Sequence, residues 1–386
     1  MSEHAPSSPE KDTPAPLWIS DDDLRGLVDD CLRAQRQVIA PMLEKGAARA
    51  RPLYAPLATA EALRLQVDDP LPSQSLRRHF QPPSQALFRW TFEKPAPTED
   101  QPPENPLGKV ALQPATPAFP PTVILGARPC DAAALEIVDQ VMREDRRDES
   151  WFSRRAATVI LTRGCTWSDA SCFCTSLGLG PDAPQGSDLL LLPAQGGHVV
   201  RVLTAKGQAF VADHAPRFAA PLPDHRRREA EAALAALRQD LENKPLSDAV
   251  DHLRQGLGGA FSAAIWDEVA LRCHGCGVCA ALCPTCYCFD IVEEPHGPKE
   301  GVRRMKWDTC QDPIFTLHGS GHNPRPNQSS RYRQRVLHKF SVYPNRFGQV
   351  LCTGCGRCVR ACPAGMDLAE ILLQVDGALD HAAKKS

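Results

Sequence analysis

Eleven of the sixteen cysteines lie between residues 273 and 362, and eight of them form two copies of one spacing pattern, C-x2-C-x2-C-x3-C-P. The first copy occupies residues 273–284 and the second occupies residues 352–363. Cysteine thiolates hold iron–sulfur clusters, and three cysteines at this spacing let one tight loop bind three corners of an Fe4S4 cube. The duplicated pattern therefore predicts two [4Fe-4S] clusters.

The fourth ligand of each cluster is expected from the other copy, because in two-cluster ferredoxins the last cysteine of each run binds the opposite cluster. The predicted ligand sets are Cys273, Cys276, Cys279 and Cys362 for the first cluster, and Cys352, Cys355, Cys358 and Cys283 for the second. Glycines flank the middle cysteine of each run, where the backbone must approach inorganic sulfide. A pair of zinc sites is the competing interpretation, but zinc generally uses C-x2-C pairs separated by longer loops.

Seven further cysteines in or near motifs have less regular spacing. Three interpretations apply to the next group, namely extra cluster ligands, residues of the pocket around the cluster sulfurs, and buried thiols; the group comprises Cys286, Cys288 and Cys310. We favour non-ligand roles, because two cubes already use eight cysteines. One more metal site in the N-terminal part could be supplied by Cys130, Cys165, Cys172 and Cys174, but their irregular spacing favours buried or loop thiols.

A basic stretch accompanies the two cysteine runs. Residues 303–360 contain eleven lysines and arginines against only Asp308 and Asp312. An oxidised cube with four thiolates carries a charge of about −2, so nearby cations would stabilise it and adjust its reduction potential. A solvated surface is the alternative for about half of these side chains. A nucleic-acid surface is a further alternative, but no recognised nucleic-acid-binding module accompanies the aromatic residues Tyr332, Phe340 and Tyr343.

The whole-chain composition excludes several classes of protein. A length of 386 residues favours two domains, and 42% apolar with 23% charged residues is typical of globular proteins. The formal charge of −2 gives no general attraction to nucleic acid or membranes. No apolar run is long enough to span a bilayer, and no secretory signal is recognised. We therefore expect a cytoplasmic protein whose cysteines bind metal rather than form disulfides.

Local patterns predict an N-terminal α/β domain over residues 17–225. Strand patterns occur at residues 122–127 and 158–162, and residues 188–203 favour a hairpin. Ser20 is a suitable N-cap for a helix whose apolar face includes Cys31. Residues 1–16 are expected to be a disordered tail, and the proline-rich residues 94–121 an extended surface insertion.

The C-terminal part is expected to be helical. Residues 226–257 form a helical bridge, with a strong amphipathic helix over 226–242, and residues 258–386 form the domain that holds both clusters. The predicted fold class is α+β, with an N-terminal α/β domain followed by an α-helical, ferredoxin-like dicluster domain.

Several longer motifs resemble a known family. They are residues 126–131 (GARPCD), 172–181 (CFCTSLGLGP), 283–290 (CPTCYCFD), 321–325 (GHNPR) and 338–340 (HKF). With these motifs the chain resembles the electron-transfer β subunit of cytoplasmic [NiFe] sulfhydrogenases and the similar A subunit of anaerobic sulfite reductase. The resemblance covers roughly residues 120 to 370, and the long interval between the cysteine runs is similar to that of α-helical ferredoxin domains.

The resemblance implies an electron-relay subunit of a hetero-oligomer. Its partners would be a flavin-containing subunit that oxidises NAD(P)H and a catalytic redox subunit of the [NiFe] hydrogenase or sulfite reductase type. The chain has no recognisable nickel–iron ligands and no G-x-G-x-x-G motif after a strand, so we expect it not to be catalytic alone. The alternatives are an autonomous flavin-dependent iron–sulfur reductase with a pocket near Arg128–Asp131, or a zinc-binding or nucleic-acid-binding interaction module.

Overall fold

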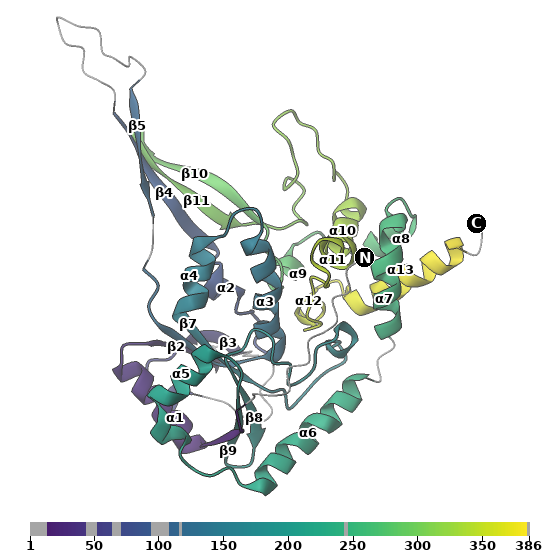
Figure 1. Cartoon of the computed structure of the whole chain (residues 1–386). Helices are drawn as coiled ribbons and strands as arrows, with labels where there is room; N and C mark the ends of the chain where they lie inside the picture. The colour runs from purple at the N-terminus through teal and green to yellow at the C-terminus, as the bar shows by residue number, and fades with distance from the viewer. Residues whose placement is uncertain are drawn as a thin grey trace, which may run out of the picture.

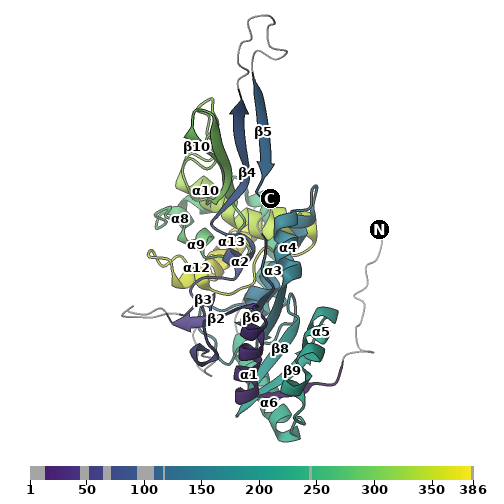
Figure 2. The ribbon, with the colours of Figure 1, turned by 90° about the vertical axis from the view of Figure 1, so that its left-hand side faces the viewer.

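The computed structural model describes residues 14–43, 52–63, 71–93, 108–115, 118–242 and 246–383. Most of the predicted N-terminal tail, residues 1–13, and the first half of the proline-rich insertion, residues 94–107, lie outside the described residues. The described residues form two sheets, the helices that cover the larger sheet, and a C-terminal group of helices. Figures 1 and 2 show the larger sheet at one end, the smaller sheet at the other, and helices α9 and α12 between them.

The larger sheet has seven strands in the order β1-β9-β8-β7-β6-β2-β3. The strands are β1 (Leu17–Ser20), β2 (Gln37–Leu43), β3 (Pro52–Pro56), β6 (Thr122–Ala127), β7 (Thr158–Arg163), β8 (Leu189–Ala194) and β9 (Gly197–Val202). Strands β2, β6, β7 and β8 pair parallel to one another. The remaining pairs, β2 with β3, β8 with β9 and β1 with β9, are antiparallel. Both β6 and β7 are buried along their whole length, as parallel strands with covered faces require. These elements confirm the predicted strands and hairpin.

Helices cover both faces of this sheet. They are α1 (Asp21–Arg33), α2 (Arg77–Phe80), α3 (Pro129–Arg143), α4 (Glu149–Ala157), α5 (Ala205–Asp213) and α6 (Asp224–Glu242). Helix α1 packs on one face and α3 and α4 on the other, because Val123 and Ile124 of β6 point into opposite cores. The predicted cap is confirmed, since the Ser20 hydroxyl accepts a hydrogen bond from the Asp23 amide, and Cys31 is buried.

The smaller sheet has four strands in the order β10-β11-β4-β5. They are β4 (Ser84–Glu93), β5 (Lys109–Pro114), β10 (Phe289–Gly297) and β11 (Glu300–Trp307). Strand β5 lies inside the proline-rich stretch, and β11 pairs with β4, so this sheet joins chain segments on both sides of the predicted bridge. The β10–β11 hairpin is a departure from the expected all-helical C-terminal part.

The C-terminal part otherwise consists of helices, most of them short, around a second core. They are α7 (Ser247–Gly256), α8 (Ile265–Ala270), α9 (Val278–Ala281), α10 (Gln328–Leu337), α11 (Tyr343–Phe347), α12 (Arg357–Arg360) and α13 (Leu368–Ala383), with a π-helical turn at His338–Val342. Short 3-10 turns occupy Ala60–Ala62, Thr175–Leu177, Ala215–Phe218 and Leu257–Ala260. The core contains Leu253, Phe340 and Leu372, and it also includes Phe173 from the N-terminal part. None of the described helices is both long and apolar enough to cross a membrane.

Candidate metal centres

The first cysteine run surrounds a cavity that we call the Cys276 cavity. It is lined by Cys273, Cys276 and Cys279 together with Cys362 of the second run. Gly275 and Gly277 have φ angles of +68° and +73°, a left-handed conformation that lets the loop bend around the cavity without a side-chain clash. The amide of Gln328 donates a hydrogen bond to the Cys273 sulfur at 3.2 Å. The cavity therefore gathers the four cysteines that the spacing groups together.

The second run surrounds a neighbouring cavity, the Cys352 cavity. It is lined by Cys352, Cys355, Cys358 and Cys283. Helix α9 carries the chain from the first loop to Cys283, and α12 carries it from the second loop to Cys362, so each short helix leads toward the other cavity. Cys358 and Arg335 line both cavities, which makes the two spaces adjacent.

Buried cations lie beside these cysteines. The Lys339 side chain is buried, and its ammonium group donates to the Cys283 sulfur at 3.4 Å, the Thr285 hydroxyl at 3.1 Å and the Leu351 carbonyl at 2.9 Å. Burial alone would lower the pKa of Lys339, but the Cys283 and Cys286 thiolates raise it above its ordinary value. A buried charge is costly unless it is compensated, so this site is suited to an anionic occupant.

One buried hydroxyl and two thiols also fit an anionic cluster. The Thr353 hydroxyl lines the Cys352 cavity and is buried without a hydrogen-bond partner in the described part of the chain. Burial raises the pKa of Cys352 to about 11 and that of Cys358 to about 12. These thiols are therefore protonated without metal, and metal binding would release their protons. The residues present fit two iron–sulfur clusters, with Thr353 positioned to donate to one of them.

The basic stretch divides into two groups. Arg335, Lys339 and Arg357 are almost completely buried, and each lies near the cysteine loops. By contrast, Arg303 and Arg304 on β11 pair with Glu293 and Glu294 of the adjacent strand in partly exposed ion pairs. The buried group can stabilise clusters, whereas the exposed group supports the hairpin.

The three additional cysteines of the C-terminal part lie outside both cavity walls. Cys286 is in hydrogen-bond contact with Cys283, and the Arg335 guanidinium lies 3.7 Å from its sulfur. Cys288 and Cys310 contact each other. None of the three is among the described residues that line the Cys276 or Cys352 cavity. Their interpretation as non-ligands stays a prediction.

The four irregular cysteines of the N-terminal part do come together. Around a third space, the Cys174 cavity, lie Cys130, Cys165, Cys172 and Cys174 with Cys355 of the second run. From the sequence, these four cysteines could form one metal site, but their irregular spacing favours buried or loop thiols. The available signal was positional, because Cys130 and Cys165 each follow a predicted buried strand within a few residues.

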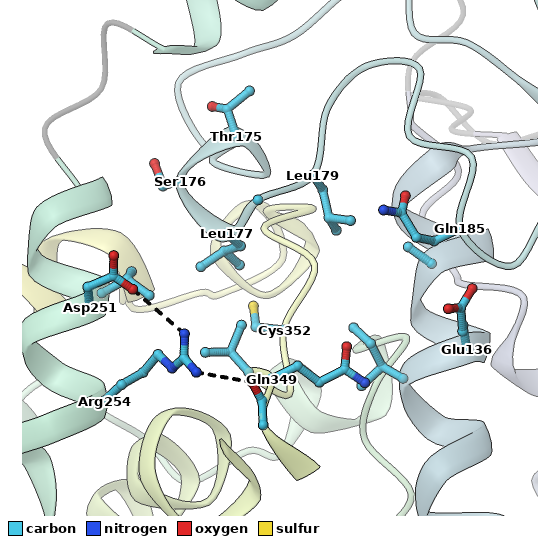
Figure 3. Close-up of a pocket in the computed structure, with 16 residues that line it drawn as sticks. Glu136, Thr175, Ser176, Leu177, Leu179, Gln185, Asp251, Arg254, Gln349 and Cys352 are labelled. Atoms are coloured by element: carbon cyan, nitrogen blue, oxygen red, sulfur yellow. Dashed lines mark hydrogen bonds and ion pairs between the residues drawn. The ribbon is translucent and has the colours of Figure 1, made fainter. Parts of the chain in front are cut away.

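A surface pocket reaches the Cys352 cavity from outside. Its volume is about 480 Å³, and Figure 3 shows Cys352 among its lining residues, between Leu177 and Gln349. Arg254 is engaged by Asp251 at 3.7 Å and by the Gly348 carbonyl at 3.0 Å. No aromatic side chain occurs among the described residues of its wall. The pocket therefore offers Cys352 a route to solvent but no stacking surface for a flavin.

The region near Arg128–Asp131 borders the Cys174 cavity. Arg128 and Cys130 line this cavity, whose wall is rich in cysteine, and Asp131 is fully buried in an ion pair with Arg357. A wall rich in thiols suits a metal site, and the autonomous flavin-dependent reductase stays an alternative.

Comparison with known proteins gives two matches. Residues 272–366 match a family model described as a 4Fe-4S dicluster domain, and this range contains both cysteine runs. The chain is also 32% identical over 256 residues to the sulfhydrogenase 2 subunit beta of Pyrococcus furiosus, an alignment that covers 66% of this chain and 73% of that protein. The dicluster domain indicates two [4Fe-4S] clusters, which replaces the zinc interpretation of the two runs.

Proposed function

Because this chain belongs to the family of sulfhydrogenase β subunits, which are iron–sulfur proteins, we propose that it relays electrons within a hetero-oligomeric redox complex. Its partners are a flavin-containing subunit that oxidises NAD(P)H and a catalytic subunit of the [NiFe] hydrogenase or sulfite reductase type. The observation that carries the proposal is the shared wall of the two cavities, formed by Cys358 and Arg335.

The crosswise cysteine sets are the proposed ligands. Cys273, Cys276, Cys279 and Cys362 hold one cluster, and Cys352, Cys355, Cys358 and Cys283 hold the other. A [4Fe-4S] cluster supplies reversible one-electron chemistry when bound. The protein's part is to keep the two sites adjacent, to exclude water and to compensate charge.

Charge compensation is the task of Lys339 and Arg335. Each reduction adds a negative charge to a site that already carries about −2, and the buried cations beside Cys283 and Cys279 offset that charge. Phe173 and Leu368 contribute apolar wall to the Cys352 cavity and limit the entry of water. Both features favour rapid electron passage without side reactions.

The two ends of this short path differ in exposure. Cys276 is exposed, so its cavity can face one redox partner at the surface. The Cys352 cavity is internal, and Cys352 borders the surface pocket of Figure 3. We assign no catalytic residue to this chain, and a cytoplasmic location accords with sixteen free cysteines, which a reducing compartment preserves.

The test uses the complex purified anaerobically with its partner subunits. Cys276→Ser and Cys352→Ser should each remove about four iron atoms per chain, because a hydroxyl is a poor ligand for a soft metal site. NAD(P)H-dependent reduction of a dye by the flavin subunit should persist, whereas electron delivery to the catalytic subunit should fall at least tenfold. Cys31→Ala, which changes a buried thiol of α1 that lines none of the three cavities, is the control. Undiminished delivery in both serine variants would refute the relay.

A further inference from the structure

The Cys174 cavity is built at a characteristic position of an α/β sheet. Cys130 lies at the start of α3, just after β6, and Cys165 follows β7. Strands β6 and β7 are parallel neighbours, so both cysteines lie at the same carboxyl edge of the sheet. This edge is where open α/β sheets bind ligands. Cys172 and Cys174 come from the loop that follows β7 and complete the wall.

Basic and apolar groups enclose the same space. The Arg360 guanidinium donates to the Cys172 sulfur at 3.0 Å and pairs with Asp169 at 2.6 Å, which fixes the loop that carries Cys172. Arg128 is 5% exposed and lines the cavity. Pro129, Pro181 and Leu241 form the apolar part of the wall. Four thiols beside two cations suit an anionic metal–thiolate group, as in the other two cavities.

A multi-metal cluster fits this cavity better than a single metal ion. Four thiolates around one Zn²⁺ lie about 4 Å apart, since each Zn–S bond is about 2.3 Å. Among the described residues, no three cysteine, histidine or acidic side chains are gathered tightly enough for one metal ion. Instead, the cysteines line a cavity on the same scale as the Cys276 cavity, with volumes of about 40 Å³ and about 20 Å³. All four cysteines are free of disulfides.

We propose that Cys130, Cys165, Cys172 and Cys174 bind a third [4Fe-4S] cluster. The new site adjoins the Cys352 cavity, because Cys355 lines both spaces and its thiol contacts that of Cys130. The Phe173 amide also donates to the Gly354 carbonyl at 2.9 Å, so the two loops are in direct contact. The three cavities therefore form a row.

The row extends the path from the exposed Cys276 to the carboxyl edge of the seven-stranded sheet. It ends near Trp167, which lines the Cys174 cavity and is 41% exposed. Passage of one electron between neighbouring sites makes and breaks no bond. The role of the third site in the relay rests on the proposed function, whereas its ability to bind a cluster does not.

The deciding experiment counts iron and acid-labile sulfide in the full chain, purified or reconstituted anaerobically. We expect about twelve of each per chain, and about eight in Cys174→Ser and in Cys165→Ser, since each cube contains four. Cys31→Ala should keep the full count. A wild-type count of about eight, or one zinc ion bound in place of four irons, would overturn the third site.

A second measurement guards against misfolding of the variants. In Cys276→Ser, the paramagnetic signal that Cys174→Ser lacks should be retained, which shows that the two variants affect different clusters. If both variants lack the same signal, the third site is wrong. Loss of the third site would leave the effects of Cys276→Ser and Cys352→Ser unchanged, so this result is distinct from failure of the proposed relay.

Discussion

Arg357 and Asp131 form a buried ion pair that joins the two cysteine-bearing parts of the molecule. Their side chains are 2% and 0% exposed, and the Arg357 Nη2 lies 2.6 Å from the Asp131 Oδ2. Arg357 belongs to α12 within the second cysteine run, and Asp131 belongs to α3 on the seven-stranded sheet. The Tyr54 hydroxyl donates to the same carboxylate oxygen at 2.7 Å. This pair therefore fixes the position of α12 relative to α3, and with it the position of the Cys352 cavity relative to the Cys174 cavity.

Breaking the pair should be costly. Arg357→Met leaves Asp131 buried without its cation and should lower the free energy of unfolding by about 3–5 kcal/mol. The double variant Arg357→Met, Asp131→Leu should recover part of that loss, because no unpaired charge remains. Anaerobic urea unfolding measures both. Arg346→Met, which removes an exposed pair with Glu144, is the control and should change stability by less than about 1 kcal/mol.

Lys339 should set the reduction potential of the cluster in the Cys352 cavity. Lys339→Met removes a buried positive charge beside Cys283, so adding an electron becomes less favourable. The midpoint potential should become more negative by on the order of 100 mV, with the iron content unchanged. Potentiometric titration followed by paramagnetic resonance measures the shift. Lys306→Met, on the exposed β11 hairpin, should leave the potential nearly constant, and an equal shift there would contradict a local effect.

Crosswise ligation makes a prediction that iron counts alone cannot test. Cys362→Ser should lose the same paramagnetic signal as Cys276→Ser, because both cysteines line the Cys276 cavity. Cys283→Ser should lose the same signal as Cys352→Ser. If ligation follows the order of the sequence instead, Cys362→Ser will match Cys352→Ser.

Local sequence signals account for much of the fold. The strands at residues 122–127 and 158–162 were predictable because an apolar run forms a buried parallel strand, and Ser20 caps α1 through a contact only three residues away. Pairing of β11 with β4 joins residues about two hundred positions apart, and no local pattern encodes it. That pairing was missed for this reason, and the local β10–β11 hairpin was not predicted either.

The same distinction applies to the metal sites. Repeated spacing grouped the cysteines that line the Cys276 and Cys352 cavities, although their ligand roles stay predictions. The Cys174 cavity depends on two separate strand ends and a loop, which only the tertiary fold brings together. The sequence likewise indicated a basic stretch, but only burial in the fold distinguishes Lys339 from the exposed basic side chains of β11.

His198 should make stability sensitive to acid. Burial lowers the pKa of His198 from its ordinary 6.5 to about 3, with a further contribution from Arg163, while the Asp21 carboxylate lies 3.8 Å away at the surface. The fold therefore favours the neutral ring, and this stabilisation is complete above pH 6.5 and is lost as the pH falls toward 3. At pH 5 the loss should be on the order of 2 kcal/mol.

His198→Leu should reduce this pH dependence, as measured by urea unfolding between pH 5 and 7. His296→Leu, at an exposed position of β10, should retain it. Equal pH profiles for wild type and His198→Leu would count against the assignment.

Gly354 should be essential for the contact between the two cysteine-bearing loops. Its φ angle is +61°, and a Cβ atom added there would lie 2.5 Å from the Cys174 amide nitrogen, closer than atoms can approach. Gly354→Ala should therefore separate the loops and reduce the iron bound in both the Cys352 and Cys174 cavities. Gly348 has a similar φ of +73°, but an added Cβ meets nothing within 4 Å.

Gly348→Ala is thus the matched control, because it pays only the backbone cost of about 1–2 kcal/mol for a left-handed residue. Iron content and the midpoint of thermal unfolding, both measured anaerobically, separate the two effects. Gly354→Ala should lose iron, whereas Gly348→Ala should lose some stability and keep its iron. Equal iron content in the two variants would mean that close packing of residues 172–174 on the second cysteine loop is not needed to assemble either cavity.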